Sequence, residues 1–258
     1  MDQFPSIVTK KKSESRLVSS EGFPQIGSVH YFDLLEKLHK DIQPKTYFEI
    51  GTESGASLSL ANCTSYAVDP KFKLKADVTG AKDAVYLFQG TSDDFFASDL
   101  ATKMKPKLDF AFLDGMHLFE YLLRDFINCE KLMAKNGQIA MHDCVPFNFL
   151  AAERVWNKRK TKSWTGDVWK VVAILKEFRT DLTIDVYDVK PSGLVVIGNL
   201  DPKNTTLEDN YGAIEKKWLD VSLEEYGLDR LNDMLNVQPF QIDFNPPDMV
   251  DAMSKKKR

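Results

Sequence analysis

The chain has 258 residues, enough for one sizeable hydrophobic core, and 34 basic against 38 acidic residues give it a formal charge of -4. That charge disfavours a nucleic-acid-binding scaffold, whose affinity depends on a basic face. No apolar run approaches the roughly twenty residues that span a bilayer, and the N-terminal residues lack the apolar core of a secretion signal. The three cysteines (Cys63, Cys129 and Cys144) are odd in number and lack a metal-binding spacing, so we expect a cytoplasmic protein without a disulfide framework.

The first half of the chain alternates short apolar segments with polar or helical ones. Residues 1 to about 27 predict an irregular arm, and Tyr31–His39 has the apolar spacing of a helix that ends before Pro44. Five short, strongly apolar segments follow, as expected of buried parallel strands: 47–50, 66–68, 85–88, 108–113 and 138–141. We expect helical crossovers between them. The crossover at 118–133 has apolar residues three and four apart, with Asn136-Gly137 as its glycine stop.

The second half closes this series with a hairpin. A helix is predicted at 168–178, followed by strands at 182–189 and 193–198. Only Lys190-Pro191-Ser192 separates the two strands, which is too short for a parallel crossover, so we expect them to pair antiparallel. We divide the chain into an arm and helix (1–43), a ligand-binding domain (44–200) and an acidic, partly helical extension (201–258), which could cover a substrate or pack on a second subunit.

The segment 47–57 is the most informative part of the sequence. An apolar strand carries Glu49 near its end and then opens into a turn with Gly51 and Gly55, before a pattern that predicts a helix N-terminus. Asp69 ends the next strand, where folds of this kind hold the ribose hydroxyls of an adenosine. The glycine spacing lacks the tight first pair of dinucleotide sites, which disfavours a nicotinamide-dependent oxidoreductase. An ordinary glycine turn of an α/β protein is the alternative.

These motifs together carry a family resemblance. The pattern E-x-G-x-x-x-G at 49–55 resembles the first motif of class I S-adenosylmethionine-dependent methyltransferases. F-L-D-G-M-H-L-F-E at 112–120, followed by H-D-x-x-P at 142–146, is similar to the small-molecule O-methyltransferases grouped with the catechol and macrolide-sugar enzymes. The resemblance runs from about residue 47 to 200. It implies a Rossmann-like, seven-stranded, mostly parallel α/β sheet with an antiparallel last strand and helices on both faces.

The resemblance also implies positions for the cofactor, S-adenosylmethionine. Glu49 and Gly51 would lie near its methionine portion, Ser54 and Gly55 at the turn, Asp69 on the ribose, Ser92 or Asp93 at the adenine, and Asp114 at the end of the fourth strand. A helix N-cap is the alternative role of Ser92 and Asp93. Asp167 is expected to cap a helix, and Trp164 and Trp169 to be either core or substrate lid.

For catalysis, the resemblance implies a base and a metal pair at the ends of strands four and five. His117 takes the place of the family's catalytic lysine and can remove a hydroxyl proton near neutral pH. Local hydrogen bonding is its alternative role. Asp114 and Asp143 would hold a divalent metal such as Mg²⁺, but Cys144 occupies the third ligand position and is a poor magnesium ligand. His142 either braces Asp143 or is structural.

The sequence therefore predicts an S-adenosylmethionine-dependent O-methyltransferase acting on a small hydroxylated molecule, such as a sugar or a phenol. A nucleoside-binding protein without transfer activity is the second hypothesis, and a nicotinamide-dependent oxidoreductase the third. The expected partner is a small-molecule acceptor rather than nucleic acid or membrane, and the terminal extensions allow a homo-oligomer.

Overall fold

The computed structural model describes residues 19–103 and 107–241, and one mixed sheet forms its centre. Residues 1–18 of the predicted arm and the part of the extension beyond residue 241 lie outside these ranges, and residues 19–27 of the arm contain no helix or strand. The seven strands have the order β3-β2-β1-β4-β5-β7-β6. Their bounds are Thr46–Ile50 (β1), Thr64–Asp69 (β2), Val85–Gln89 (β3), Leu108–Leu113 (β4), Met133–His142 (β5), Thr183–Tyr187 (β6) and Leu194–Gly198 (β7).

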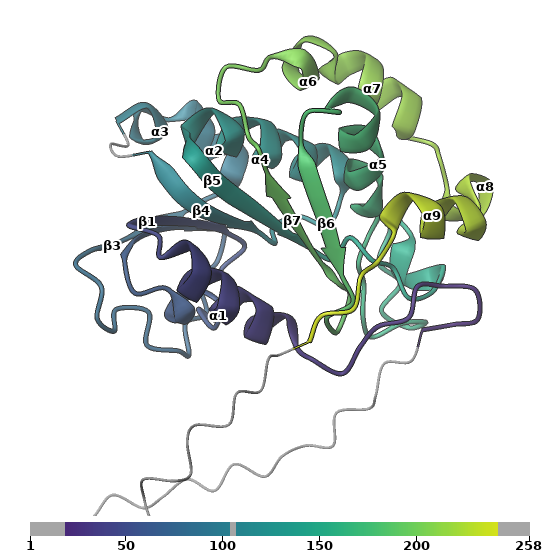
Figure 1. The fold of residues 1–258 in the computed structure, drawn as a ribbon, viewed down its shortest axis with the longest axis horizontal. Coiled ribbons are helices and arrows are strands. Elements are labelled where there is room, and N and C mark those ends of the chain that lie inside the picture. The colour runs from purple at the N-terminus through teal and green to yellow at the C-terminus, as the bar shows by residue number, and fades with distance from the viewer. Residues whose placement is uncertain (1–18, 104–106, 242–258) are drawn as a thin grey trace, which may run out of the picture.

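The strand directions confirm the predicted Rossmann-like fold (Figure 1). The five strands β1 to β5 pair parallel with one another, and β7 pairs antiparallel with both β5 and β6. The short connection between β6 and β7 makes the predicted antiparallel hairpin. Because β1, β4 and β5 are parallel and adjacent, their carboxyl ends open at the same edge of the sheet, where α/β folds bind ligands.

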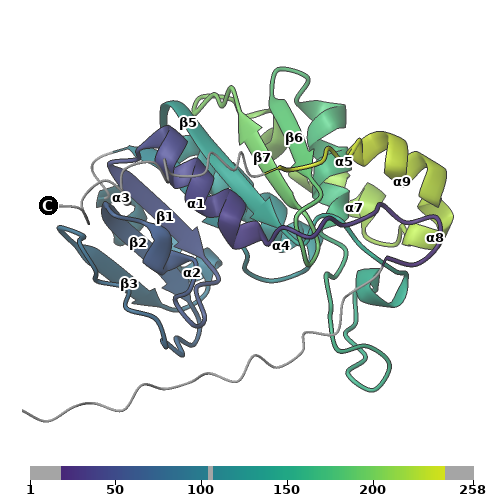
Figure 2. The same ribbon diagram turned by 60° about the horizontal axis from the view of Figure 1, so that its bottom comes forward.

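Helices cover both faces of the sheet, but unequally (Figures 1 and 2). Helix α1 (Tyr31–Ile42) packs on one face through Leu34 and Leu35, against strand residues such as Phe110. The opposite face carries the remaining long helices and the larger hydrophobic core. The other helices are α2 (Ser92–Ala97), α3 (Asp99–Lys103), α4 (Phe119–Leu132), α5 (Trp169–Phe178), α6 (Thr206–Asp209), α7 (Tyr211–Trp218), α8 (Leu223–Tyr226) and α9 (Leu228–Leu235), with 3-10 turns η1 (Leu58–Leu60) and η2 (Leu150–Ala152).

Two of the predicted helical crossovers are absent. After the glycine turn the chain forms only η1, and 70–84, between β2 and β3, contains no helix. This 3-10 turn buries one side chain, Leu58. Residues 73–76 instead fold back on the glycine turn, where the backbone N–H groups of Lys75 and Ala76 donate to the Ser54 carbonyl oxygen. The prediction of a helix N-terminus beside Gly55 was wrong.

Asn136-Gly137 is not the predicted helix stop. Helix α4 ends at Leu132, and β5 begins at once with the extended residue Met133. The β4–β5 register shifts between the pairs Leu108–Met133 and Phe110–Gln138, so the intervening residues form a bulge in which Asn136 has φ 68°. Asparagine and glycine tolerate this left-handed backbone, which a bulge uses as readily as a helix end.

The segment after β7 joins the main core. Trp218, Tyr226, Leu231 and Leu235 are buried and belong to the hydrophobic cluster that contains α4 and α5. Within the described ranges, no helix has the length and apolarity needed to cross a membrane.

Candidate active site

The turns that follow β1 and β4 meet at the carboxyl edge of the sheet. The Asp114 N–H donates to the Ile50 carbonyl oxygen at 2.9 Å, which continues the strand pairing into the turn. Gly51 has φ +87°, and a Cβ atom there would lie 1.9 Å from the Asp114 carbonyl oxygen. A side chain cannot occupy that space, so Gly51 is what allows the two turns to approach.

Asp114, His117 and Asp143 form a cluster at this edge. One ligand atom from each lies within 4.8 Å of the others. His117 Nε2 is 3.2 Å from Asp143 Oδ2 and 3.7 Å from Asp114 Oδ1. The structure thus brings together the predicted base and the two predicted metal ligands, which come from two different strand ends.

The hydrogen bond at the far side of the His117 ring fixes which nitrogen faces the cluster. His117 Nδ1 lies 2.8 Å from the carbonyl oxygen of Trp164. A carbonyl oxygen only accepts, so Nδ1 carries the hydrogen. In the neutral ring Nε2 therefore has the lone pair, and it points toward the two carboxylates. An imidazole held in this way can take a proton or bind a metal through Nε2.

His142 braces both aspartates. Its Nδ1 is 3.2 Å from Asp114 Oδ1 and 3.5 Å from Asp143 Oδ1. Burial alone would lower the pKa of His142, but the carboxylates of Asp143 and Asp114 outweigh it and raise the pKa to about 10. Asp143 also accepts a hydrogen bond from the Ser192 hydroxyl, at the turn of the β6–β7 hairpin.

Cys144 takes no part in the cluster. Its side chain is fully buried, and its Sγ donates to the His142 carbonyl oxygen at 3.3 Å. Burial also raises the pKa of the thiol well above its usual value, so it remains protonated. The donor set is therefore two carboxylates and one imidazole, a combination that suits a divalent metal.

Glu49 is the buried acid of the glycine turn region. The Tyr47 hydroxyl donates to Glu49 Oε2 at 2.6 Å, while Glu49 Oε1 and the Thr52 hydroxyl have no hydrogen bond to any described residue. Burial raises the pKa of Glu49 to about 7, although the nearby hydroxyl groups of Tyr47, Thr52 and Ser57 act in the opposite direction. A buried acceptor without a partner beside a glycine turn fits a ligand that brings a donor or a positive charge, such as the ammonium group of S-adenosylmethionine.

Asp69 organises the backbone around the same turn. Its Oδ2 accepts from the Glu53 N–H at 2.8 Å, and its Oδ1 accepts from the Lys71 N–H at 2.6 Å. Each carboxylate oxygen retains a second lone pair that a ribose hydroxyl could use. Gly55 has φ +79°, and a Cβ there would lie 2.5 Å from Val78 Cγ1, so Gly55 serves the packing of the 70–84 loop.

The two residues predicted at the adenine have other contacts. Thr91, not Ser92 or Asp93, is the N-cap of α2, so the alternative role was misplaced by one residue. The Asp93 carboxylate accepts from Arg124 Nε at 2.9 Å and from Arg124 Nη2 at 2.7 Å. That ion pair occupies both oxygens of Asp93, and the Ser92 hydroxyl hydrogen-bonds to the buried Asp125 carboxyl.

Sequence patterns did not predict that Tyr31 lies at the site, and they left Trp164 as either core or substrate lid. The Tyr31 ring stacks on His142 with ring centroids 4.1 Å apart, and Trp164 stacks on His117 at 5.2 Å. Burial and the carboxylates of Asp114, Asp143 and Glu49 raise the pKa of Tyr31 far above its usual value, so the hydroxyl remains a hydrogen-bond donor. These contacts join residues far apart in the chain, and local patterns do not report them.

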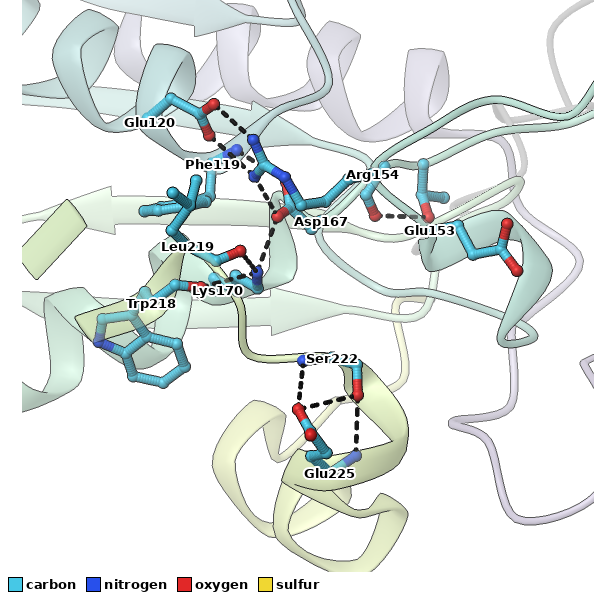
Figure 3. Close-up of polar contacts among 12 residues, drawn as sticks. Phe119, Glu120, Glu153, Arg154, Asp167, Lys170, Trp218, Leu219, Ser222 and Glu225 are labelled. Atoms are coloured by element: carbon cyan, nitrogen blue, oxygen red, sulfur yellow. Dashed lines mark hydrogen bonds and ion pairs between the residues drawn. The ribbon is translucent and has the colours of Figure 1, made fainter. Parts of the chain in front are cut away.

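A buried ionic network holds the segment that carries Trp164 (Figure 3). Arg154 donates to both oxygens of Glu120 and to Asp167, and Lys170 Nζ donates to Asp167 at 2.8 Å. Asp167 also accepts from the Phe119 N–H at 3.0 Å, so it caps α4 rather than its own helix. A cavity of about 270 Å³ adjoins this network, and its lining does not include the aspartate–histidine cluster. Trp169 is core.

The comparisons with known proteins agree with the observed fold. Residues 48–144, from β1 to the end of β5, match a family model described as a methyltransferase domain. An O-methyltransferase from Bacillus cereus in complex with SAH is 14% identical, with a TM-score of 0.50 over 66% of this chain and 80% of that one. TomG from Streptomyces achromogenes, an O-methyltransferase in complex with SAM, is 16% identical, with a TM-score of 0.50 over 68% and 82%. A cofactor-bound protein from MTB is 16% identical, with a TM-score of 0.52 over 70% and 84%. No curated protein sequence matches the chain.

Proposed function

We propose that this chain, which carries a methyltransferase domain of the class I fold, is an S-adenosylmethionine-dependent O-methyltransferase for a small hydroxylated acceptor such as a sugar or a phenol. The observation that carries the proposal is the cluster of Asp114, His117 and Asp143 at the carboxyl edge of the sheet, beside the glycine turn. A base, two acids and a nucleoside-sized turn at one edge suit methyl transfer to a hydroxyl group.

The cofactor would be held at the β1 and β2 ends. Glu49 Oε1 and the Thr52 hydroxyl, both without partners among the described residues, would receive the methionine portion, with Gly51, Ser54 and Gly55 forming the turn. Asp69 would accept from the ribose hydroxyls, and Ser92 would lie nearest the adenine. When bound, S-adenosylmethionine supplies the methyl group on its positively charged sulfur.

His117 would act as the base. Its Nδ1–H is fixed on the Trp164 carbonyl oxygen, so an acceptor hydroxyl that approaches beside Nε2 and Asp143 could pass its proton to Nε2. That proton would remain on the imidazole until solvent removes it. His142 and Ser192 would keep Asp143 in place. Catalysis of this kind depends on positioning and proton removal.

A divalent metal fits the same cluster. Asp114 and Asp143 would hold it, and the absence of an oxygen ligand at Cys144 leaves His117 Nε2 as the third donor within reach. A bound metal would lower the pKa of a coordinated hydroxyl. If His117 is a metal ligand, it cannot also be the free base. Activity that survives chelation would exclude a required metal and leave His117 free to act as the base.

Transfer of a labelled methyl group from S-adenosylmethionine to a panel of hydroxylated sugars and phenols tests the proposal. We expect at least one acceptor to be labelled by the parent chain and not by Asp143→Asn, which keeps the shape of the side chain but removes its charge. A labelled acceptor whose methyl group is on nitrogen or carbon would contradict O-methylation.

A further inference from the structure

The connection between β5 and α5 carries an unusual concentration of positive charge. Lys158, Arg159, Lys160 and Lys162 are all exposed and form no ion pair with the described residues. Several lysines on helices do form ion pairs: Lys40, Lys103 and Lys217 each lie 3.0 Å or less from a carboxylate oxygen. In a chain with a formal charge of -4, this segment is a local positive patch.

Two tryptophans connect this patch to the candidate base. The Trp156 and Trp164 rings are parallel within 2° with centroids 5.9 Å apart, and Trp164 stacks in turn on His117. Hydrogen bonds fix both indoles, from Trp156 Nε1 to the Thr161 carbonyl oxygen at 3.2 Å and from Trp164 Nε1 to the Glu153 carbonyl oxygen at 2.6 Å. Trp156 is 39% exposed, and the Lys158 ammonium lies over its ring, 4.6 Å from the centroid, so the row of stacked rings runs from His117 to the basic segment.

The two ends of the β5–α5 connection are held in place, while its middle projects. Arg154 and Asp167 close the base through the network of Figure 3. In Figure 2 the connection between β5 and α5 extends away from the body of the molecule. A connection whose ends are fixed beside the site and whose middle is exposed is suited to recognition of a ligand that enters from solvent.

We propose that residues 154–164 recognise the acceptor, and that the acceptor carries a phosphate or another anionic group next to a planar ring. Exposed lysine and arginine side chains favour anions through charge-assisted hydrogen bonds, and a planar ring can take the place of the Lys158 ammonium over the exposed Trp156 indole. This inference rests on the proposed function, because the acceptor hydroxyl must reach His117 from the same side.

Uridine diphosphate and uridine are suitable probes, since they share a planar ring and differ in charge. Both are titrated calorimetrically into the full chain saturated with S-adenosylhomocysteine, which keeps the nucleotides out of the cofactor site. We expect the diphosphate to bind at least about tenfold more tightly than uridine. The combined change Lys158→Gln, Arg159→Gln and Lys160→Gln should remove that tenfold difference, as expected when three charged contacts are lost.

A matched variant controls for net charge. Lys45→Gln, Lys135→Gln and Lys203→Gln together remove the same charge from exposed positions near the opposite end of the strands and should leave both affinities unchanged. Trp156→Ala should weaken both nucleotides alike. Equal losses in the two triple variants, or no binding of uridine diphosphate, would overturn the inference, as would much tighter binding of a short oligouridine RNA. Absent binding of S-adenosylhomocysteine would instead contradict the proposed function itself.

Discussion

At the scale of single residues, the candidate site depends on two side chains that are held by specific partners. His117 presents Nε2 to the cluster because the Trp164 carbonyl oxygen holds Nδ1–H at 2.8 Å. Glu49 keeps one oxygen without a partner in a fully buried position. His117 is placed to accept a proton, and Glu49 is placed to pair with a positive charge.

We expect His117→Gln to lose about a hundredfold or more in turnover, the usual contribution of a positioned base. Glutamine retains a donor for the Trp164 carbonyl oxygen but has no basic nitrogen. Affinity for S-adenosylhomocysteine should be unchanged, which separates the loss of the base from misfolding. Turnover at the parent rate would exclude His117 as the base.

The pKa of Glu49 determines how cofactor affinity should vary with pH. In the protein without cofactor, the Glu49 carboxyl has a pKa of about 7, so it is largely protonated at pH 6. Pairing with the cofactor's ammonium group favours the charged form, so binding should release about half a proton at pH 7 and should strengthen from pH 6 to 8. Calorimetry in buffers with different ionisation enthalpies measures the proton release. Glu49→Gln should abolish it, and proton release that persists in this variant would exclude Glu49 as its source.

At the scale of elements, the site depends on how strand ends and connections fit together. The β1 and β4 turns touch at Gly51, and the β5–α5 connection is pinned through Asp167, which contacts the α4 N-terminus, Arg154 and Lys170. Each of these contacts joins two elements that lie apart in the sequence.

Gly51→Ala should destabilise the chain and reduce its affinity for S-adenosylhomocysteine. The backbone conformation alone costs about 1 to 2 kcal/mol, and the added methyl group would displace the Asp114 carbonyl oxygen. Gly212→Ala is the matched control, since a Cβ there meets nothing within 4 Å and lies in α7. It should be neutral or stabilising by up to about 1 kcal/mol. Equal urea midpoints for the two variants would contradict this role of Gly51.

Asp167→Ala should destabilise the chain by about 3 kcal/mol, because it leaves the buried Lys170 without its counterion. Glu36→Ala removes an exposed ion pair with Lys40 and should change stability by less than about 1 kcal/mol. The free energies of unfolding in urea compare the two directly. A small loss in Asp167→Ala would mean that Lys170 finds other partners.

The elements also show what the sequence could predict. Strand positions were predictable because short apolar segments such as 110–113 are typical of buried strands, and Lys190-Pro191-Ser192 is too short for a parallel crossover. The bulge at Asn136-Gly137 was mistaken for a helix stop because both structures use a left-handed residue. The stacking of Tyr31 on His142 depends on contacts more than a hundred residues apart in sequence, which periodicity does not report.

At the scale of the whole molecule, the site lies at the carboxyl edge of the sheet, between segments that are far apart in the chain. Helix α1 brings Tyr31 to one side of the carboxyl edge, and the β5–α5 connection brings Trp164 to the other. The aspartate–histidine cluster could be predicted from the family pattern, because strand order alone brings Asp114 and Asp143 to neighbouring strand ends. The surroundings of the cluster could not, since they come from segments without a recognisable pattern.

A calorimetric titration of the full chain with S-adenosylhomocysteine, and separately with NAD, tests the cofactor assignment most directly. The glycine turn without a tight first pair, the unpartnered oxygen of Glu49 and the carboxylate of Asp69 suit a nucleoside without phosphates. We therefore expect S-adenosylhomocysteine to bind with a Kd on the order of micromolar, and NAD to bind at least about tenfold more weakly. Tight binding of NAD without any binding of S-adenosylhomocysteine would contradict the proposed methyltransferase function.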